Sequence, residues 1–358
     1  MKIVLIGENG SVHIQKWIRA LADSGKLELH VISFERGATF ENVHYHFLQR
    51  ITSTKLDYVL NIGRVRQIIR SIRPDIVHAH YATSYGYMAA CSKSTPLIIT
   101  GWGADIFDSP KQLIMRKMLS FSFSKANALT VLSEVTRREM KKYTDKPVQL
   151  IPFGVNTKSF TPVERENRTE VCIGTVRTLT EKYGVEYLIR AVASIYSTNR
   201  NIRLSIVGDG PLRESLEALA VSLGIGQITT FHGFVNQNTE FTRYKSLLDE
   251  MDIFSILSII DSETFGVASV EASACGLPVL ATSVGGLPEV VLDNETGLLV
   301  PPKNVDATTK ALTRLVQDKL IRLQFGKAGR QYVCDKYDWT NNVNDMIQLY
   351  QQTFQANS

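Results

Sequence analysis

Two glutamates separated by seven residues, Glu263 and Glu271, are the part of the sequence best suited to binding a hydroxyl-rich ligand. Glu263 precedes a predicted strand-to-helix turn, and Glu271 lies on the following helix. Eight positions are slightly more than two helical turns, so Glu271 is expected roughly on the face below Glu263. The Phe265-Gly266 step can present backbone N–H groups at the helix N-terminus, where phosphate and sugar oxygens are favoured. Taken alone, the spacing fits two solvated glutamates better, so the surrounding elements decide its interpretation.

The elements that must position these residues alternate between short apolar strands and amphipathic helices, which predicts an α/β architecture with parallel sheets. The first series of expected strands is Lys2–Gly7, Leu27–Phe34, Asp75–His80, Pro96–Gly101, Ala128–Ser133 and Val148–Phe153. The clearest helices of this half are His13–Lys26, Leu56–Arg73 and Ser133–Tyr143, the last with a serine N-cap.

A second series of strands begins after a polar linker, Ile151–Pro162, which contains Pro152, Gly154 and Pro162. Its expected strands are Val171–Val176, Arg203–Val207, Ile228–Phe231, Ile253–Leu257, Pro278–Thr282 and Leu298–Val300. Its expected helices are Glu181–Asn199, Leu212–Leu223, Thr239–Glu250, Phe265–Ala274 and Leu287–Leu292, followed by a helical tail from Asn304. The pattern predicts two Rossmann-like, doubly wound domains that face each other across a cleft.

The stretch Ser262–Glu271, with Gly285–Glu289 and Thr296–Val300, resembles the family-four retaining glycosyltransferases, also called glycosyl transferases group 1, which have the GT-B fold. The resemblance covers nearly all of residues 150–340, and the N-terminal half matches more loosely through Asp75–His80 and Gly101–Asp105. It implies an acceptor-binding domain at residues 1–153, onto which a C-terminal helix at about 341–358 packs back. Residues 154–340 are then the nucleotide-sugar-binding domain.

The resemblance also implies roles for individual residues. Arg177 and Lys182 correspond to the basic pair on the donor pyrophosphate, where fixed cations stabilise the charge of the leaving group; a surface pair at a helix start is the alternative. Together with Glu263, which contacts the donor sugar, they form the expected catalytic set. The expected donor-binding residues are Gly10, Arg177, Lys182, Val235, Glu263, Phe265, Gly266, Val267 and Glu271, of which Glu271 holds the ribose.

One departure from the family concerns the end of the fifth N-terminal strand, where Trp102 stands in place of a histidine. An indole has a single N–H to donate and accepts no proton. Another group must therefore take over the orienting role, and the candidates are His80, Asp105 and the donor's own phosphate. The expected acceptor-binding residues are His13, His80 and Asp105. His13 is equally well explained as an ordinary residue at the start of a helix.

The function that the resemblance implies is transfer of a hexose, with retention, from a nucleotide sugar to a glycan or lipid-linked acceptor in the biosynthesis of a surface polysaccharide. A UDP-sugar is the favoured donor, with GDP and ADP as the open alternatives to UDP. Neither a cofactor nor a metal is expected, because the Arg177–Lys182 pair supplies the positive charge. The alternatives are a nucleotide-sugar-binding protein with a disabled site and a nucleotide-sugar epimerase on the same scaffold.

Charge is distributed unevenly along the chain. Residues 1–150 contain 21 Lys and Arg against 12 Asp and Glu, whereas residues 151–358 contain 19 against 23. A basic first half suggests an anionic partner, which is a membrane surface, a lipid phosphate or a phosphorylated acceptor; chance and solvated helix faces explain it equally well. No motif suggests nucleic acid. The segment Lys111–Lys125 mixes cations with apolar residues and is expected either on a membrane surface or as a core helix. No secretory signal or membrane-spanning run is visible, so the expected location is cytoplasmic, peripheral at the inner membrane face.

Overall fold

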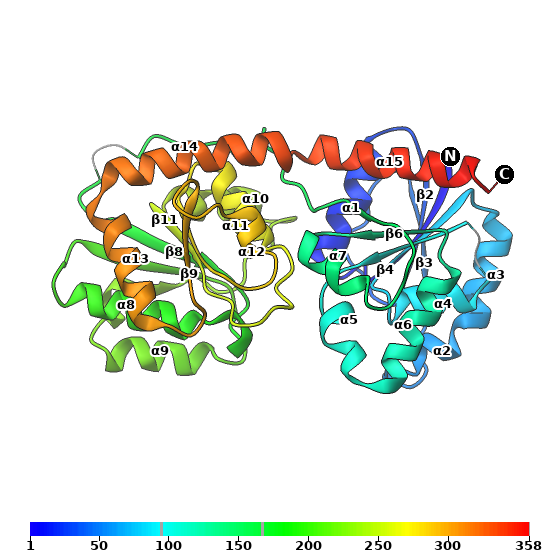
Figure 1. Ribbon diagram of the computed structural model, residues 1–358, viewed down its shortest axis with the longest axis horizontal. Coiled ribbons are helices and arrows are strands. Elements are labelled where there is room, and N and C mark those ends of the chain that lie inside the picture. Colours follow the sequence, from blue (N-terminus) through cyan, green and yellow to red (C-terminus); the bar gives the residue numbers. More distant parts are fainter. Residues whose placement is uncertain (94–95, 166–167, 358) are drawn as a thin grey trace. The chain divides into compact units, whose positions relative to one another are not determined.

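The computed structural model describes residues 1–93, 96–165 and 168–357. The chain forms two compact units (Figure 1). Unit 1 comprises Met1–Pro152 with Asn341–Ser358, and unit 2 comprises Phe153–Thr340. Each unit is a parallel sheet with helices on both faces, which is the expected α/β architecture. No helix in the described residues has both the length and the apolarity needed to cross a membrane.

Unit 1 contains a seven-stranded sheet in the order β3-β2-β1-β4-β5-β6-β7. Its strands are β1 (Lys2–Ile6), β2 (Glu28–Ser33), β3 (Val43–Phe47), β4 (Ile76–His80), β5 (Leu97–Gly101), β6 (Ala128–Val131) and β7 (Val148–Leu150). The strand order reverses direction between β1 and β4, which is where ligands bind in open α/β sheets. The sequence pattern missed β3, because this edge strand alternates the polar residues His44 and His46 with apolar or aromatic ones and has no buried apolar run.

The helices of unit 1 are α1 (Val12–Asp23), α2 (Asp57–Leu60), α3 (Ile62–Ile72), α4 (Tyr85–Cys91), α5 (Ala104–Phe107), α6 (Leu113–Lys125) and α7 (Glu134–Met140). The single helix expected over Leu56–Arg73 is wrong, because the chain leaves the helical conformation at Asn61. The Asn61 side-chain amide donates to the carbonyl oxygens of Asp57 and Gln49 at 3.0 and 3.2 Å and fixes this break. The serine N-cap of α7 is confirmed, since the Ser133 hydroxyl accepts from the backbone N–H of Thr136.

Unit 2 contains a six-stranded sheet in the order β10-β9-β8-β11-β12-β13. Its strands are β8 (Val171–Val176), β9 (Ile202–Val207), β10 (Thr229–Phe231), β11 (Ile253–Ile256), β12 (Val279–Thr282) and β13 (Gly297–Val300), which agree with the six expected runs. Its helices are α8 (Val185–Tyr196), α9 (Arg213–Ser222), α10 (Phe241–Asp249), α11 (Val267–Ala274), α12 (Leu287–Val290), α13 (Val305–Gln317) and α14 (Lys319–Lys336). Because β8 and β11 are neighbours, the loops after their carboxyl ends meet at one edge of the sheet.

The last helix, α15 (Trp339–Gln355), contributes most of its length to unit 1. Tyr350 is fully buried there, and its hydroxyl is 2.7 Å from Nδ1 of His78 on β4. His78 Nε2 is in turn 2.7 Å from the hydroxyl of Thr100 on β5. Burial lowers the pKa of His78 to about 3, so this histidine is a neutral bridge between the C-terminal helix and the sheet.

Stability is therefore expected to fall as the pH falls below 6.5. The unfolded chain protonates His78 near its ordinary pKa of 6.5 while the folded chain does not until about 3. The stability that the neutral ring contributes is fully present above pH 6.5, and about 2 kcal/mol of it is lost at pH 5. Urea unfolding at pH 7 and pH 5 measures this loss, and His78→Gln should show a shallower dependence on pH. Equal dependences in the two proteins would contradict the assignment.

Candidate functional site

Unit 2 brings Arg177 and Glu263 together at the carboxyl edge of its sheet. Arg177 follows β8, while Ser258 and Glu263 lie in the loop between β11 and α11. The Arg177 guanidinium donates through Nη2 to the Glu263 carboxylate and, at 2.9 Å, to the Ser258 hydroxyl. Ser258 also donates to Glu263 at 2.9 Å. The Arg177 and Glu263 side chains are only 11% and 10% exposed, so the pair is held in a medium that screens charge weakly.

Lys182 lies close to this pair through Tyr183. The centroid of the Tyr183 ring is 4.5 Å from Cζ of Arg177 and 4.7 Å from Nζ of Lys182, so both cations contact the same aromatic ring. The Lys182 carbonyl oxygen accepts from the backbone N–H of Ile259 at 2.9 Å, which ties this short turn to the loop that carries Glu263. Lys182 is exposed, and it remains available to an anionic ligand.

The start of α11 places backbone donors beside Glu263. Gly266 has φ +73°, a left-handed conformation that a side chain would strain. No residue in the described part of the chain hydrogen-bonds the backbone N–H groups of Phe265, Gly266 and Val267. These groups point out of a helix N-terminus, where the dipole favours a negative charge. The Phe265 ring is buried and packs edge-on against Tyr337 with centroids 5.3 Å apart.

Two further glycines hold the Glu263 loop in place. The backbone N–H of Gly286 donates to the Glu263 carbonyl oxygen at 2.9 Å. A Cβ at Gly285 would lie 2.0 Å from that same oxygen, and one at Gly286 would lie 1.9 Å from the Thr264 carbonyl oxygen. The Gly285-Gly286 pair is therefore required for the close approach of the two loops.

Glu271 is a separate carboxylate on α11, and it is 2% exposed. The Tyr244 hydroxyl on α10 donates to Glu271 Oε2 at 2.7 Å. Burial and the neighbouring carboxylate raise the pKa of Tyr244, which keeps its proton available for this bond. The expectation that Glu271 lies on a helix face below Glu263 is wrong, because α11 begins only at Val267 and Glu263 lies in the preceding loop. The two glutamates have different partners.

Val235, the residue expected to contact the base, is buried in the loop after β10.

Unit 1 contains a cavity of about 660 Å³ near the carboxyl ends of β1, β4 and β5. Its walls include Glu8 and Ser11 from the first loop, Arg50, Tyr81 and Tyr85, His80 and Trp102, and Met115 and Met118 from α6. Gly10 lies between two lining residues and is exposed. The lining combines aromatic and apolar surface with a few polar groups, as is typical of a small-molecule site.

His80 is a buried polar side chain in this wall. The Trp102 indole N–H donates to His80 Nδ1 at 3.3 Å. Since the indole only donates, Nδ1 accepts and the ring proton of neutral His80 resides on Nε2. Burial and the adjacent His78 hold the pKa of His80 well below its usual value. His80 Nε2 is buried and has no hydrogen-bond partner among the described residues, so the ring offers one donor to a ligand.

The other two acceptor-binding candidates lie around Trp102. The carboxylate of Asp105 is fully buried and accepts from the backbone N–H groups of Ala82, Trp102 and Gly103 at 2.7, 3.0 and 2.8 Å. Its visible role is thus to hold the loop that carries Trp102. The His13 ring is 6.2 Å from the Trp102 ring, centroid to centroid.

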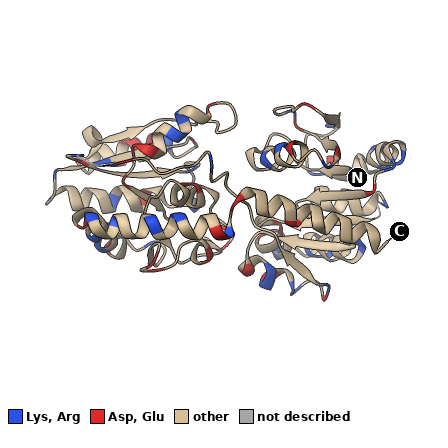
Figure 2. Ribbon diagram, turned by 90° about the horizontal axis from the view of Figure 1, so that it is seen from above, with Lys and Arg blue, Asp and Glu red and all other residues tan. Residues whose placement is uncertain are grey.

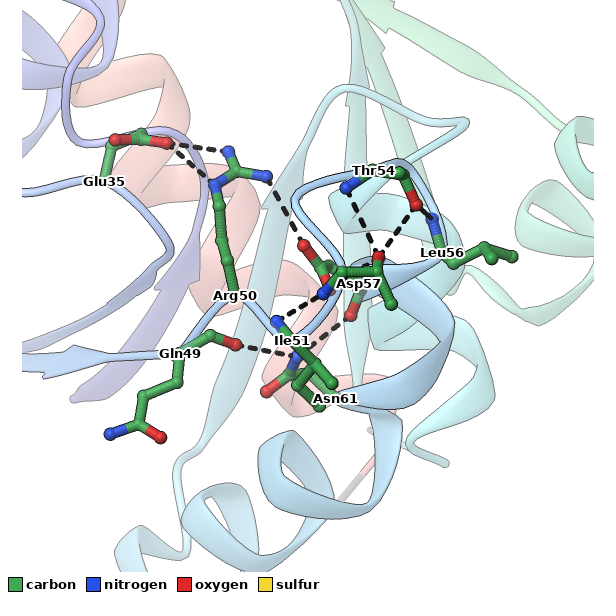
Figure 3. A network of polar contacts seen from close by, with 9 residues as sticks. Glu35, Gln49, Arg50, Ile51, Thr54, Leu56, Asp57 and Asn61 are labelled. Carbon is green, nitrogen blue, oxygen red and sulfur yellow. Dashed lines mark hydrogen bonds and ion pairs between the residues drawn. The ribbon is translucent and has the colours of Figure 1, made fainter.

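Arg50 is a cavity residue that sequence reasoning missed. Figure 3 shows its guanidinium between Glu35 and Asp57, with Nη2 2.7 Å from Glu35 Oε1 and Nη1 3.9 Å from Asp57 Oδ2. Burial raises the pKa of Asp57, but the N–H donors of Thr52 and Ile51 outweigh it and the net shift is downward. Arg50 thereby faces the cavity as a fixed cation. No motif marks this arrangement, since its members come together only through folding.

Comparisons with known proteins relate this chain to the glycosyltransferases. Residues 157–332 match the family described as glycosyl transferases group 1, and residues 2–133 match the glycosyl transferase 4-like family. An uncharacterized glycosyltransferase of Methanocaldococcus jannaschii is 24% identical over 96% of this chain and 94% of its own length. A GDP-mannose-dependent phosphatidylinositol monomannoside mannosyltransferase of Mycolicibacterium smegmatis is 31% identical over 63% of this chain and 62% of its own length.

Two solved structures have the same fold. Sucrose-phosphate synthase from Thermosynechococcus elongatus superposes with a TM-score of 0.83 at 21% identity, covering 99% of this chain and 100% of that one. Anabaena HepE in complex with UDP has a TM-score of 0.83 at 17% identity and covers 98% of this chain and 100% of that one. The chain therefore belongs to the group 1 glycosyltransferases and has the GT-B fold.

Proposed function

We propose that this glycosyltransferase takes a sugar from a nucleotide-sugar donor and transfers it, with retention of the anomeric configuration, to a glycan or lipid-linked acceptor in surface polysaccharide biosynthesis. The observation that carries the proposal is the cluster of Arg177, Lys182 and Tyr183 beside Glu263 and the donor-rich start of α11. The cluster combines cations and N–H groups suited to a diphosphate with a carboxylate suited to a sugar hydroxyl.

The proposed reaction requires charge stabilisation more than acid–base chemistry from the protein. As the bond from the anomeric carbon to the diphosphate breaks, negative charge grows on the leaving oxygen, and Arg177 and Lys182 stabilise it. The leaving phosphate takes the proton of the acceptor hydroxyl, which attacks the same face. Glu263, released from Arg177 once the diphosphate binds that cation, accepts hydrogen bonds from the donor sugar.

UDP is the nucleotide that we favour in the donor, because HepE was solved with UDP and with UDP-glucose. The mycobacterial relatives are named as GDP-mannose-dependent, so GDP-mannose is the competing donor. Glu271, held by Tyr244, is the proposed ribose ligand for either nucleotide.

Transfer is expected to proceed without a divalent cation, because Arg177 and Lys182 supply the positive charge at the diphosphate. Purified protein with nucleotide sugar and a lipid-linked acceptor should give a product with the donor's anomeric configuration, as measured by NMR. The rate should be unchanged in EDTA. Loss of transfer in EDTA with recovery on adding Mg²⁺ or Mn²⁺ would refute the metal-independent mechanism, and an inverted product would refute retention.

The surface of α6 supports an acceptor at a membrane. Leu113 and Ile114 are 67% and 71% exposed, although an apolar side chain gains by burial, and Phe121 is also exposed. Arg116 and Lys117 are exposed beside them. Leu119 and Phe123 are buried in the core, so α6 combines an inward core face with an exposed basic and apolar face. Lys and Arg of unit 1 lie mostly on helices and loops, as Figure 2 shows.

The cavity of unit 1 is lined in part by the same helix. Ser53, Thr54 and Lys55 line it on one side, next in sequence to exposed Leu56, while Met115 and Met118 of α6 line it on another. A lipid-linked glycan would be presented to this cavity at a membrane surface. We therefore propose peripheral attachment of unit 1 to the inner, anionic face of the membrane.

The double variant Arg116→Glu, Lys117→Glu is expected to lose binding to liposomes that contain anionic lipid, because each cation near such a surface contributes about 1 kcal/mol. Two charge reversals should weaken binding at least tenfold in a sedimentation assay. The control is Arg70→Glu, Lys141→Glu, which changes the net charge of unit 1 equally through two other exposed cations. Equal binding by both variants would remove α6 from the proposal.

A further inference from the structure

Three histidines and a glutamate line one face of the sheet edge in unit 1. Strands β2 and β3 pair in parallel, with His30 opposite His44. Side chains two residues apart on a strand point to the same face, so Glu28 joins His30 and His46 joins His44. This face is accessible, because Glu28 and His44 are exposed, while the His30 side chain is 12% exposed.

The side chains are close enough to share a cation. His30 Nε2 is 3.1 Å from Glu28 Oε1, and the stacked rings of His30 and His44 have centroids 4.6 Å apart. One ligand atom from each of these three residues lies within 4.8 Å of the other two. Ligands bound tetrahedrally to zinc at about 2.0–2.1 Å are roughly 3.3 Å apart. Small side-chain rotations would therefore suffice to form a site.

We propose that Glu28, His30 and His44 bind a divalent transition-metal cation, with zinc the best match and water as the fourth ligand. Two imidazoles and a carboxylate suit zinc, copper or nickel better than magnesium or calcium, which prefer oxygen ligands. His46 is the outer partner. Its Nε2 lies 3.1 Å from His30 Nδ1, so the ring nitrogen that does not bind the metal donates its hydrogen there.

Two nearby cations, Lys2 and Arg64, oppose the binding of a metal cation. Lys2 Nζ lies 3.2 Å from Glu28 Oε1, and the bound metal replaces it. Lys2 keeps a second partner, the Ile72 carbonyl oxygen at 3.4 Å. Arg64 acts on His46 electrostatically and opposes the positive charge of the metal. The proposed effect of the metal is to stabilise the sheet edge. Strand β3 is the outermost strand, and the metal would link it to β2 in addition to their backbone hydrogen bonds.

The site is separate from the proposed transfer chemistry, since none of its members is among the residues of the 660 Å³ cavity or the Arg177 cluster. Full-length protein stripped with EDTA is titrated with ZnCl₂, and its melting temperature is measured. At a hundredfold excess over the dissociation constant, zinc should raise the melting temperature of unit 1 by about 5–10 °C. Cobalt should give the visible absorption of a tetrahedral nitrogen–oxygen site.

The variants His44→Asn and Glu28→Gln should abolish both signals, while His46→Gln should weaken zinc binding about 10–100-fold. The control is His232→Asn, in unit 2, which should bind zinc like the parent. His44→Asn should also keep the parent's affinity for nucleotide sugar, so the two proposals fail independently. No zinc-dependent shift in the parent, or an equal shift in His44→Asn, would overturn the metal site.

Discussion

Replacement of Arg177 by alanine is expected to lower kcat for sugar transfer by about 10²–10³-fold. The guanidinium stabilises charge that develops only as the diphosphate leaves, and removal of one such donor typically costs about 2.7–4 kcal/mol of transition-state stabilisation. Because the Arg177 side chain is only 11% exposed, solvent screens its charge weakly, and the loss of that charge beside the diphosphate is felt in full. Single-turnover rates at saturating donor measure the effect.

Arg177→Ala also leaves Glu263 without its cation, so the loss of rate must be separated from a change in folding. Circular dichroism and the melting temperature check the fold, and Arg177→Lys keeps the charge but loses the bridge to Ser258. The matched control is Arg190→Ala on α8, an exposed arginine paired with Glu186, whose kcat should stay within twofold of the parent. A folded Arg177→Ala variant with a kcat near that of the parent would exclude Arg177 from catalysis.

Glu271→Ala should weaken nucleotide binding about 10–100-fold. A hydrogen bond to a charged group contributes about 1.5–3 kcal/mol, and Glu271 is the buried carboxylate proposed to hold the ribose diol. Isothermal titration with the free nucleotide diphosphate measures this loss without interference from turnover.

Tyr244→Phe is expected to have a smaller effect, about threefold to tenfold, because it removes the hydrogen bond that orients Glu271 but leaves the carboxylate in place. Tyr244 is thus a positioning residue, and its loss should change the dissociation constant while kcat at saturation stays close to the parent value. Glu217→Ala on α9, whose side chain is 43% exposed, serves as the control. Unchanged affinity in Glu271→Ala would place the ribose elsewhere.

The sequence pattern located most strands because each is a short apolar run bounded by polar or glycine-rich turns. The pattern failed for elements whose structure depends on contacts with distant parts of the chain. Strand β3 is an edge strand whose histidines are typical of a loop. The break at Asn61 depends on a side-chain amide that donates to the Gln49 carbonyl oxygen in another segment. Neither feature has a periodicity that a single sequence reveals.

The candidate site was predictable in its charged members and not in their partners. Arg177 and Glu263 were expected near the same ligand, and in the structure the Arg177 guanidinium donates a hydrogen bond to the Glu263 carboxylate. Tyr183 and Tyr244 were missed, because an aromatic residue at helical spacing usually belongs to the core and only folding shows which charge it contacts. Their roles in binding and catalysis stay predictions until the variants are measured.

The central claim is that unit 2 binds a nucleotide sugar through the Arg177 cluster and Glu271. The most direct test is a thermal-shift screen of the purified protein against UDP, GDP, ADP, CMP and dTDP and their common sugar conjugates. One nucleotide family, UDP by our proposal, should stabilise the protein by about 2.7 kcal/mol at a hundredfold excess over its dissociation constant. The shift should shrink in Lys182→Ala and in Glu271→Ala. No shift with any nucleotide would contradict the claim and favour a protein whose donor site is disabled.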